Sequence, residues 1–141
     1  MIAEDDAVSR LILQRAIEKA HHEVVPTADG LEAWACFQEE VFDVVISDWM
    51  MPGIDGMELC RRIRDYGQEQ GSYTYFIMAT ALGEREHFLA GMGEGADDYL
   101  TKPLDRMELL VRLIVGERIM SLYRQLQEKQ EQLDRLTERQ S

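Results

Sequence analysis

The sequence has few cysteines, and they do not form a recognisable pattern. Only Cys36 and Cys60 are present, each in a segment with helical spacing, and neither has a second cysteine or a histidine at metal-ligand spacing. This argues against a disulfide framework and against a cysteine-ligated metal. We expect both to be buried or half-buried thiols in a reducing compartment.

Long apolar runs and an excess of basic charge are missing as well. No stretch approaches the roughly 20 apolar residues that a membrane-spanning helix needs, and the N-terminus lacks the basic-then-apolar pattern of a signal peptide. We therefore expect a cytoplasmic protein with no membrane segment. The 15 basic and 27 acidic residues give a formal charge of -12, whereas nucleic acid binding needs clustered Lys and Arg. Direct nucleic acid contact by this chain is therefore not expected.

The sequence does contain an alternation of β-rich runs and helical periodicity. The 141 residues, 45% of them hydrophobic, fit one compact domain plus an extension. Strands are predicted at 1–3, 23–27, 43–47, 75–79 and 98–101, with helices between them and a last helix starting near Asp105. This alternation predicts an α/β fold with a parallel sheet between helices.

Local signals place several helix and loop boundaries. Asp29 and Asp55 each precede a glutamate by three residues, which predicts two helix N-caps. The segment 67–73, "GQEQGSY", reads as a loop, and a helix is predicted over 84–92. The first helix is expected to turn one apolar stripe inward: Val8, Leu11, Ile12, Ala16 and Ala20.

The last helix continues past the point where a globular domain would end. Its apolar residues fall at heptad spacing with Lys129 in one core position: Ile119, Leu122, Leu126, Leu133 and Leu136. A solvated helical tail and a two-stranded coiled coil both fit, and the spacing favours the coiled coil. We expect a domain over residues 1–117 and a helical linker over 118–141.

Polar residues follow four of the predicted strands directly. Glu4 and Asp5 follow the first, Asp48 the third, Thr80 the fourth and Lys102 the fifth. In open α/β sheets the ligand lies outside the carboxyl ends of the strands. Three carboxylates gathered there repel one another unless a cation is present, and oxygen ligands suit Mg²⁺. With a lysine and a hydroxyl opposite, the set indicates phosphoryl transfer with Asp48 as nucleophile.

Each of these residues also has an ordinary structural explanation. Adjacent acids such as Glu4, Asp5 and Asp6 are often a helix N-cap. Thr80 could be a simple strand residue, and Lys102 a solvent-exposed one. Their joint occurrence in order at the ends of four strands favours the site.

These motifs resemble the receiver domain of bacterial response regulators. The matching segments are "IAEDD", "VVISDWMMPGIDGMEL", "IMATA" and "GADDYLTKPL", which extend to about residue 117. The resemblance implies a flavodoxin-like, doubly wound five-stranded parallel sheet in the order 2-1-3-4-5. It also implies a signalling phosphoacceptor that catalyses only its own phosphorylation and dephosphorylation.

The resemblance assigns roles residue by residue. Asp48 would accept a phosphoryl group from a phosphohistidine of a sensor histidine kinase or phosphotransfer protein, or from a small phosphodonor. Asp48, Asp5 and the backbone carbonyl of Met50 would bind Mg²⁺, and Glu4 would help directly or through a water.

Three further roles follow from the same resemblance. Lys102 would pair with the carboxylate or phosphoryl oxygens, and its bond to Pro103 is typically cis in the family. Thr80 would hydrogen-bond the phosphoryl oxygen, and its movement would be coupled to the aromatic residue Tyr99.

Two features depart from the family pattern. The first strand is short for a central strand, so further residues are expected upstream of Met1. Met50 and Leu82, two residues after Asp48 and Thr80, are apolar where many relatives carry polar groups that position the hydrolytic water. We expect slow self-dephosphorylation, because nothing at these positions orients water.

Three functions from different classes remain open. The favoured one is a receiver that controls a missing C-terminal output domain through the helical linker, with a homodimer formed by that helix. The second is a Mg²⁺-dependent phosphatase, although that class carries a second acid where Met50 stands. The third is a receiver-like module that is never phosphorylated, which usually lacks one of the residues present here.

Overall fold

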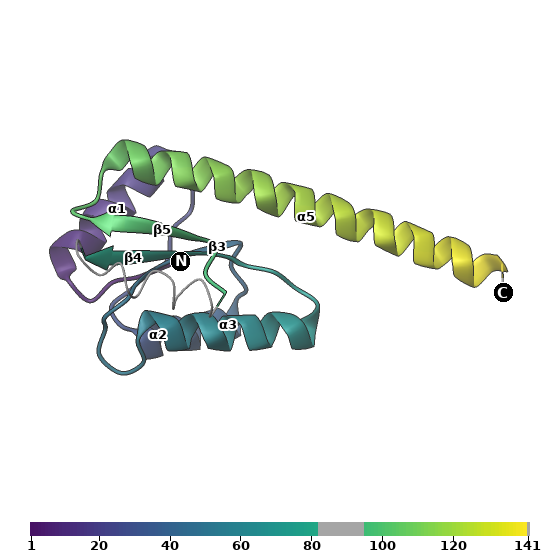
Figure 1. Cartoon of the computed structure of the whole chain (residues 1–141), viewed down its shortest axis with the longest axis horizontal. Coiled ribbons are helices and arrows are strands. Elements are labelled where there is room, and N and C mark those ends of the chain that lie inside the picture. Colours follow the sequence, from purple (N-terminus) through teal and green to yellow (C-terminus); the bar gives the residue numbers. More distant parts are fainter. Residues whose placement is uncertain (82–94, 141) are drawn as a thin grey trace.

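The computed structural model describes residues 1–81 and 95–140 and shows a sheet covered by helices on both faces (Figure 1). The strands are β1 (Ile2–Ala3), β2 (Pro26–Thr27), β3 (Val44–Asp48), β4 (Tyr75–Ala81) and β5 (Asp98–Lys102). The helices are α1 (Ala7–Lys19), α2 (Gly30–Glu39), α3 (Gly56–Gln70) and α5 (Arg106–Gln140). The helix predicted over 84–92 lies outside the described residues.

All described strands are parallel, in the order β2-β1-β3-β4-β5. The predicted fold class and strand order are therefore confirmed. Successive residues of β3 face opposite sides of the sheet: Val45 packs with α2 and α3, while Ile46 packs with α1 and α5. Two apolar layers thus hold the sheet, and its carboxyl edge stays available for polar residues.

The expected inward stripe of α1 is largely wrong. Val8, Leu11 and Ile12 are exposed. Of the expected stripe, Ala16 is buried as predicted, and the helix packs Leu13 and Ile17 beside it against the sheet. Both sets have helical spacing, so periodicity alone could not decide which of them faces the sheet.

The predicted N-caps of α2 and α3 are confirmed, since the carboxylates of Asp29 and Asp55 accept hydrogen bonds from backbone amides three residues later. The loop predicted over 67–73 is partly wrong, because α3 runs on to Gln70. It ends at Gly71, whose φ of 67° gives the left-handed conformation of a C-cap.

A guanidinium ties α3 to the amino ends of β4 and β5. Arg64 donates hydrogen bonds to the carbonyl oxygens of Gly95 and Thr74 and, at 2.7 Å, to Oδ2 of Asp97. The same Asp97 oxygen accepts the amide of Phe76 at 2.8 Å. These half-buried contacts fix the edge of the sheet opposite the polar residues.

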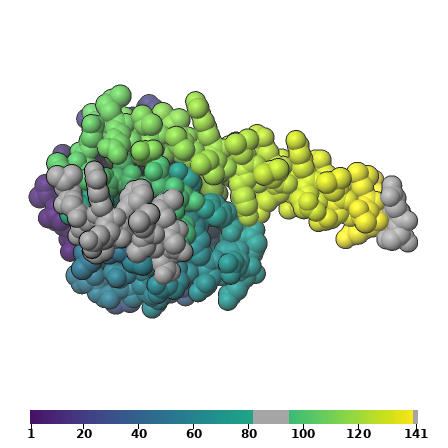
Figure 2. Space-filling model, viewed as in Figure 1, coloured from purple at the N-terminus to yellow at the C-terminus, as the bar shows by residue number. Residues whose placement is uncertain are grey.

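Helix α5 runs without a break from the domain into the extension (Figures 1 and 2). It passes close to β4 at Gly116, where a Cβ would lie 2.8 Å from the ring of Tyr75. Contacts with the domain continue beyond residue 117: the side-chain amide of Gln127 donates to the carbonyl of Gly71 at 2.9 Å, and Arg124 pairs with Asp43. Among the described residues, no helix is long and apolar enough to cross a membrane.

Candidate functional site

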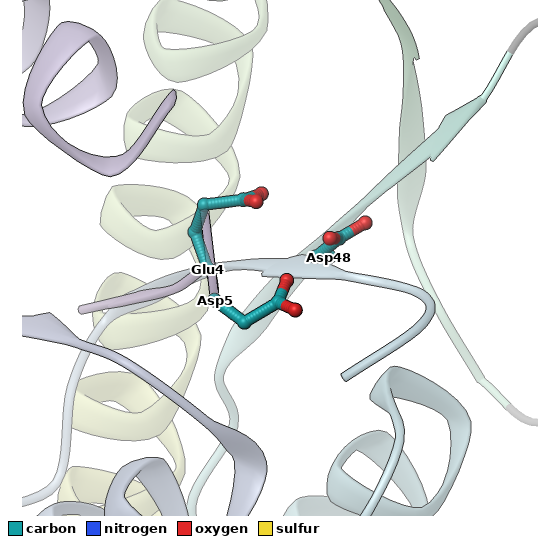
Figure 3. Close-up of side chains that lie close together, drawn as sticks. All are labelled: Glu4, Asp5 and Asp48. Atoms are coloured by element: carbon teal, nitrogen blue, oxygen red, sulfur yellow. The ribbon is translucent and has the colours of Figure 1, made fainter. Parts of the chain in front are cut away.

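Three carboxylates meet at the carboxyl edge of the sheet. Glu4 and Asp5 follow β1 and Asp48 ends β3, and these strands are parallel neighbours in the sheet. One oxygen from each carboxylate lies within 4.8 Å of the others. Figure 3 shows the three side chains gathered close together, with the carboxylate of Asp5 pointing toward Asp48.

The helix cap and the acidic cluster use different residues. Asp6 is the N-cap of α1, where its Oδ2 accepts the amide of Ser9 at 2.9 Å. Glu4 is only 1% exposed, and its Oε1 accepts the amide of Asp6 at 3.2 Å. The capping explanation therefore accounts for Asp6 alone and leaves Glu4 and Asp5 for the site.

Lys102 lies among the carboxylates rather than in solvent. Its Nζ is 2.9 Å from Oε2 of Glu4 and 3.0 Å from Oδ2 of Asp48. It is the last residue of β5, and the peptide bond from Lys102 to Pro103 is cis. One ammonium thus joins acids from two other strands.

The environment changes the proton affinities of this group. Burial, reinforced by the charges of Glu4 and Asp5 and opposed by Lys102, raises the pKa of Asp48 to about 6. Burial opposes the charge on Lys102, but its hydrogen bonds to Glu4 and Asp48 and the negative charges of these carboxylates together raise the pKa of the ammonium. The protonation of Asp48 and that of Lys102 therefore depend on each other.

The donor set fits a hard divalent cation. Three carboxylates and one ammonium leave an excess of negative charge, and all the side-chain donors are oxygens, as Mg²⁺ prefers. The carboxylates that would hold the ion are Glu4, Asp5 and Asp48. Met50, predicted to add its backbone carbonyl, lies in the turn after β3 and is 61% exposed.

Thr80 lies near this edge of the sheet, whereas Tyr99 lies near the start of β5. Thr80 follows Ala79, which is the partner of Asp48 in the β3–β4 register, and it is buried. Tyr99 is a buried residue of β5 in the apolar layer that α2 and α3 cover. Their expected roles stay predictions, and Leu82 falls outside the described residues.

Backbone contacts fix the turn that carries Asp48. The amide of Trp49 donates to the carbonyl of Ala79 at 3.1 Å, and the amide of Gly56 donates to the carbonyl of Trp49 at 2.7 Å. A Cβ on Gly56 would lie 2.4 Å from the carbonyl oxygen of Asp48. The turn therefore needs glycine at this position, and the start of α3 holds the end of β3 in place.

Sequence reasoning missed one supporting residue, Arg10. Its guanidinium donates a hydrogen bond at 2.8 Å to the carbonyl oxygen of Glu4, which steadies the backbone between β1 and α1. No spacing rule marks this arginine, because its role depends on where the first turn of α1 lies relative to β1.

Comparison with known proteins adds an independent finding. A family model described as the response regulator receiver domain matches residues 1–114. Transcriptional regulatory protein TcrA of Mycobacterium tuberculosis is 41% identical over 113 residues, which cover 80% of this chain and 43% of that protein. Phosphate regulon transcriptional regulatory protein PhoB of Rhizobium meliloti is 38% identical over 112 residues, 79% of this chain and 48% of that protein. The chain thus spans less than half the length of these curated relatives.

Solved structures agree with the fold. The receiver domain of the Francisella response regulator 1452 superimposes with a TM-score of 0.74 and 33% identity, covering 84% of this chain and 95% of that one. Chemotaxis response regulator CheY4 of Vibrio cholerae gives a TM-score of 0.74 at 32% identity, covering 82% and 94%.

Proposed function

The chain belongs to the response-regulator receiver family, and from that premise we propose that it is a cytoplasmic phosphoacceptor switch with Asp48 as the acceptor. The observation that carries the proposal is the contact of Lys102 with both Glu4 and Asp48 beside Asp5. The donor is a sensor histidine kinase or a phosphotransfer protein.

In the proposed reaction, a carboxylate oxygen of Asp48 attacks the phosphorus of a phosphohistidine. The bond between the imidazole nitrogen and phosphorus breaks, and the electron pair stays with the imidazole while an aspartyl-phosphate forms. Lys102 balances the negative charge on the carboxylate and then on the phosphoryl oxygens. The hydroxyl of Thr80 donates a hydrogen bond to the phosphoryl group. The resulting movement of Thr80 is coupled to a movement of the Tyr99 side chain.

Magnesium fits this proposal. Asp5, Asp48 and the Met50 carbonyl would hold the ion, with Glu4 assisting directly or through a water. When bound, the ion neutralises charge on the transferred phosphoryl group. The ion pair between Glu4 and Lys102 neutralises the charge of the buried Glu4 carboxylate.

The proposed output lies beyond this chain. The two curated relatives named above are transcriptional regulators more than twice the length of the matched segment. With a formal charge of -12, this chain is not the part expected to contact DNA. We expect residues 118–141 to link the receiver to an output domain and to pair with a second copy of the chain.

Acetyl phosphate with Mg²⁺, followed by intact-mass measurement, tests the central step. The wild-type chain should gain one phosphoryl group, Asp48→Asn should gain none, and the exposed Asp65→Asn control should behave as wild type. Release of phosphate without a retained adduct would support the phosphatase instead. No mass change in folded protein would rule out the phosphoacceptor.

A further inference from the structure

Helix α5 uses two different faces beyond residue 114. One face packs on the domain: Gly116 approaches Tyr75, Met120 is buried, and Gln127 bonds to the carbonyl of Gly71. The other face carries an exposed apolar stripe: Val115, Ile119, Leu122, Leu126, Leu133 and Leu136. Stripe residues from Ile119 onward are 39–66% exposed, although the helix is docked as far as Gln127.

The stripe follows a heptad repeat that Lys129 interrupts. Steps of 4 and 3 residues run from Val115 to Leu136 and place Lys129 in the core position between Leu126 and Leu133. This position comes just after Gln127, where the helix leaves the domain. Lys129 therefore separates a docked block of apolar residues from a projecting block.

We propose that Lys129 sets the strength and alignment of a parallel homodimer formed along this stripe, an inference that rests on the dimer of the proposed function. In a parallel pair every core residue meets its own copy, so all layers are apolar except one that holds two lysines. The aliphatic stems can lie along Leu126 and Leu133 while the ammonium groups reach for water. Bringing two like charges into one layer makes the dimer weaker.

The antiparallel alternative satisfies the stripe less well. An antiparallel register that separates the two lysines sets each against Leu126 of the other copy and leaves Val115 outside the apolar core. Two polar layers then replace one. The parallel alignment buries more of the exposed apolar stripe than the antiparallel one. A second copy of the chain therefore fits the stripe as a parallel partner.

Neighbouring positions give the pair no electrostatic support. The residues that flank the core between Leu122 and Thr137 are uncharged: Tyr123, Gln125, Gln130, Gln132 and Thr137. Ion pairs between such flanking positions often strengthen coiled coils, and here they are missing along this stretch of the sequence. The core layers alone therefore decide the affinity, so one lysine has a large effect.

Sedimentation of the full chain tests the inference. Lys129→Leu should lower the dimer dissociation constant at least about 100-fold, because it replaces two charges by apolar contacts. Glu131→Leu, which adds the same side chain off the stripe, should change it less than about threefold. An equal effect of the two substitutions would overturn the role of Lys129.

Alignment and the underlying dimer are tested separately. Adding Leu136→Cys to the chain that keeps Lys129 should allow a disulfide between copies, with the wild-type chain as the control for Cys36 and Cys60. Failure of a dimer to crosslink would overturn the parallel alignment. If neither wild type nor Lys129→Leu dimerises, the proposed homodimer itself is wrong.

Discussion

Asp48→Asn should stabilise the folded domain in magnesium-free buffer, although it removes the proposed phosphoacceptor. The Asp48 side chain is only 12% exposed and lies beside Glu4 and Asp5. Burial and these neighbours raise its pKa from 3.8 to about 6, despite the opposing charge of Lys102. The ionised carboxylate is therefore less favourable in the folded chain than in the unfolded one.

The size of the effect follows from proton linkage. A rise from 3.8 to about 6, at about 1.4 kcal/mol for each tenfold change in proton affinity, corresponds to at most about 3 kcal/mol. We expect a gain of about 1–3 kcal/mol, because the asparagine carbonyl can still accept a hydrogen bond from Lys102.

The sign depends on pH. A raised folded-state pKa contributes stability that is fully present below pH 4 and is lost as the pH rises through about 6. Wild type therefore loses stability relative to Asp48→Asn across this window. The difference between the two proteins should be near zero at pH 4 and should level off above pH 6.

Urea denaturation from pH 4 to 8 in EDTA measures this difference without adding salt. The exposed Asp65→Asn is the matched control and should change the unfolding free energy by less than about 0.5 kcal/mol. Adding Mg²⁺ should stabilise wild type by mass action and narrow the gap. A gain that is absent at pH 7.5, or equally large at pH 4, would refute the electrostatic reasoning.

Three further predictions concern packing, the sheet edge and the site. Gly116→Ala should lower the unfolding free energy by about 1–2 kcal/mol despite a better helix propensity, because its methyl would lie 2.8 Å from the Tyr75 ring; a higher melting temperature would contradict this. Arg64→Met should cost about 3 kcal/mol in urea denaturation by leaving the Thr74 carbonyl without this donor and Asp97 without its ion pair, and a loss below 1 kcal/mol would disprove it. Met50→Asn and Leu82→Glu should speed loss of the phosphoryl group, as followed by intact mass over time; unchanged rates would reject the slow-dephosphorylation hypothesis.

The resemblance to receiver domains implies the strand order, whereas the polar edge can be predicted from local sequence. Asp48 and Lys102 directly follow apolar runs, and parallel strands end at one edge, so their approach follows from topology. Of the three adjacent acids for which a helix N-cap was the ordinary explanation, Asp6 is the one that caps α1. A sequence cannot separate a cap from a ligand when both are adjacent carboxylates.

The remaining features depend on contacts between distant segments. The inward face of α1 is chosen by the shape of the sheet, so Leu13 and Ile17 are buried although Leu11 and Ile12 have equally good spacing. The role of Arg10 and the docking of Gln127 on Gly71 likewise need three-dimensional placement. Periodicity predicts that a helix has an apolar face, but not which part of the molecule covers that face.

Because α5 is continuous, the orientation of its docked residues on the domain fixes the direction that its far residues face. An α-helix turns about 100° with each residue and rises about 1.5 Å, so the 35 residues of α5 form a rod about 50 Å long. A tilt of a few degrees at the receiver end would move the far end by several ångströms. The number of residues in the helix would also set the direction in which any segment joined to that end points. Inserting seven residues into α5 would keep this direction nearly unchanged, whereas inserting two would turn the segment to the opposite side of the helix axis.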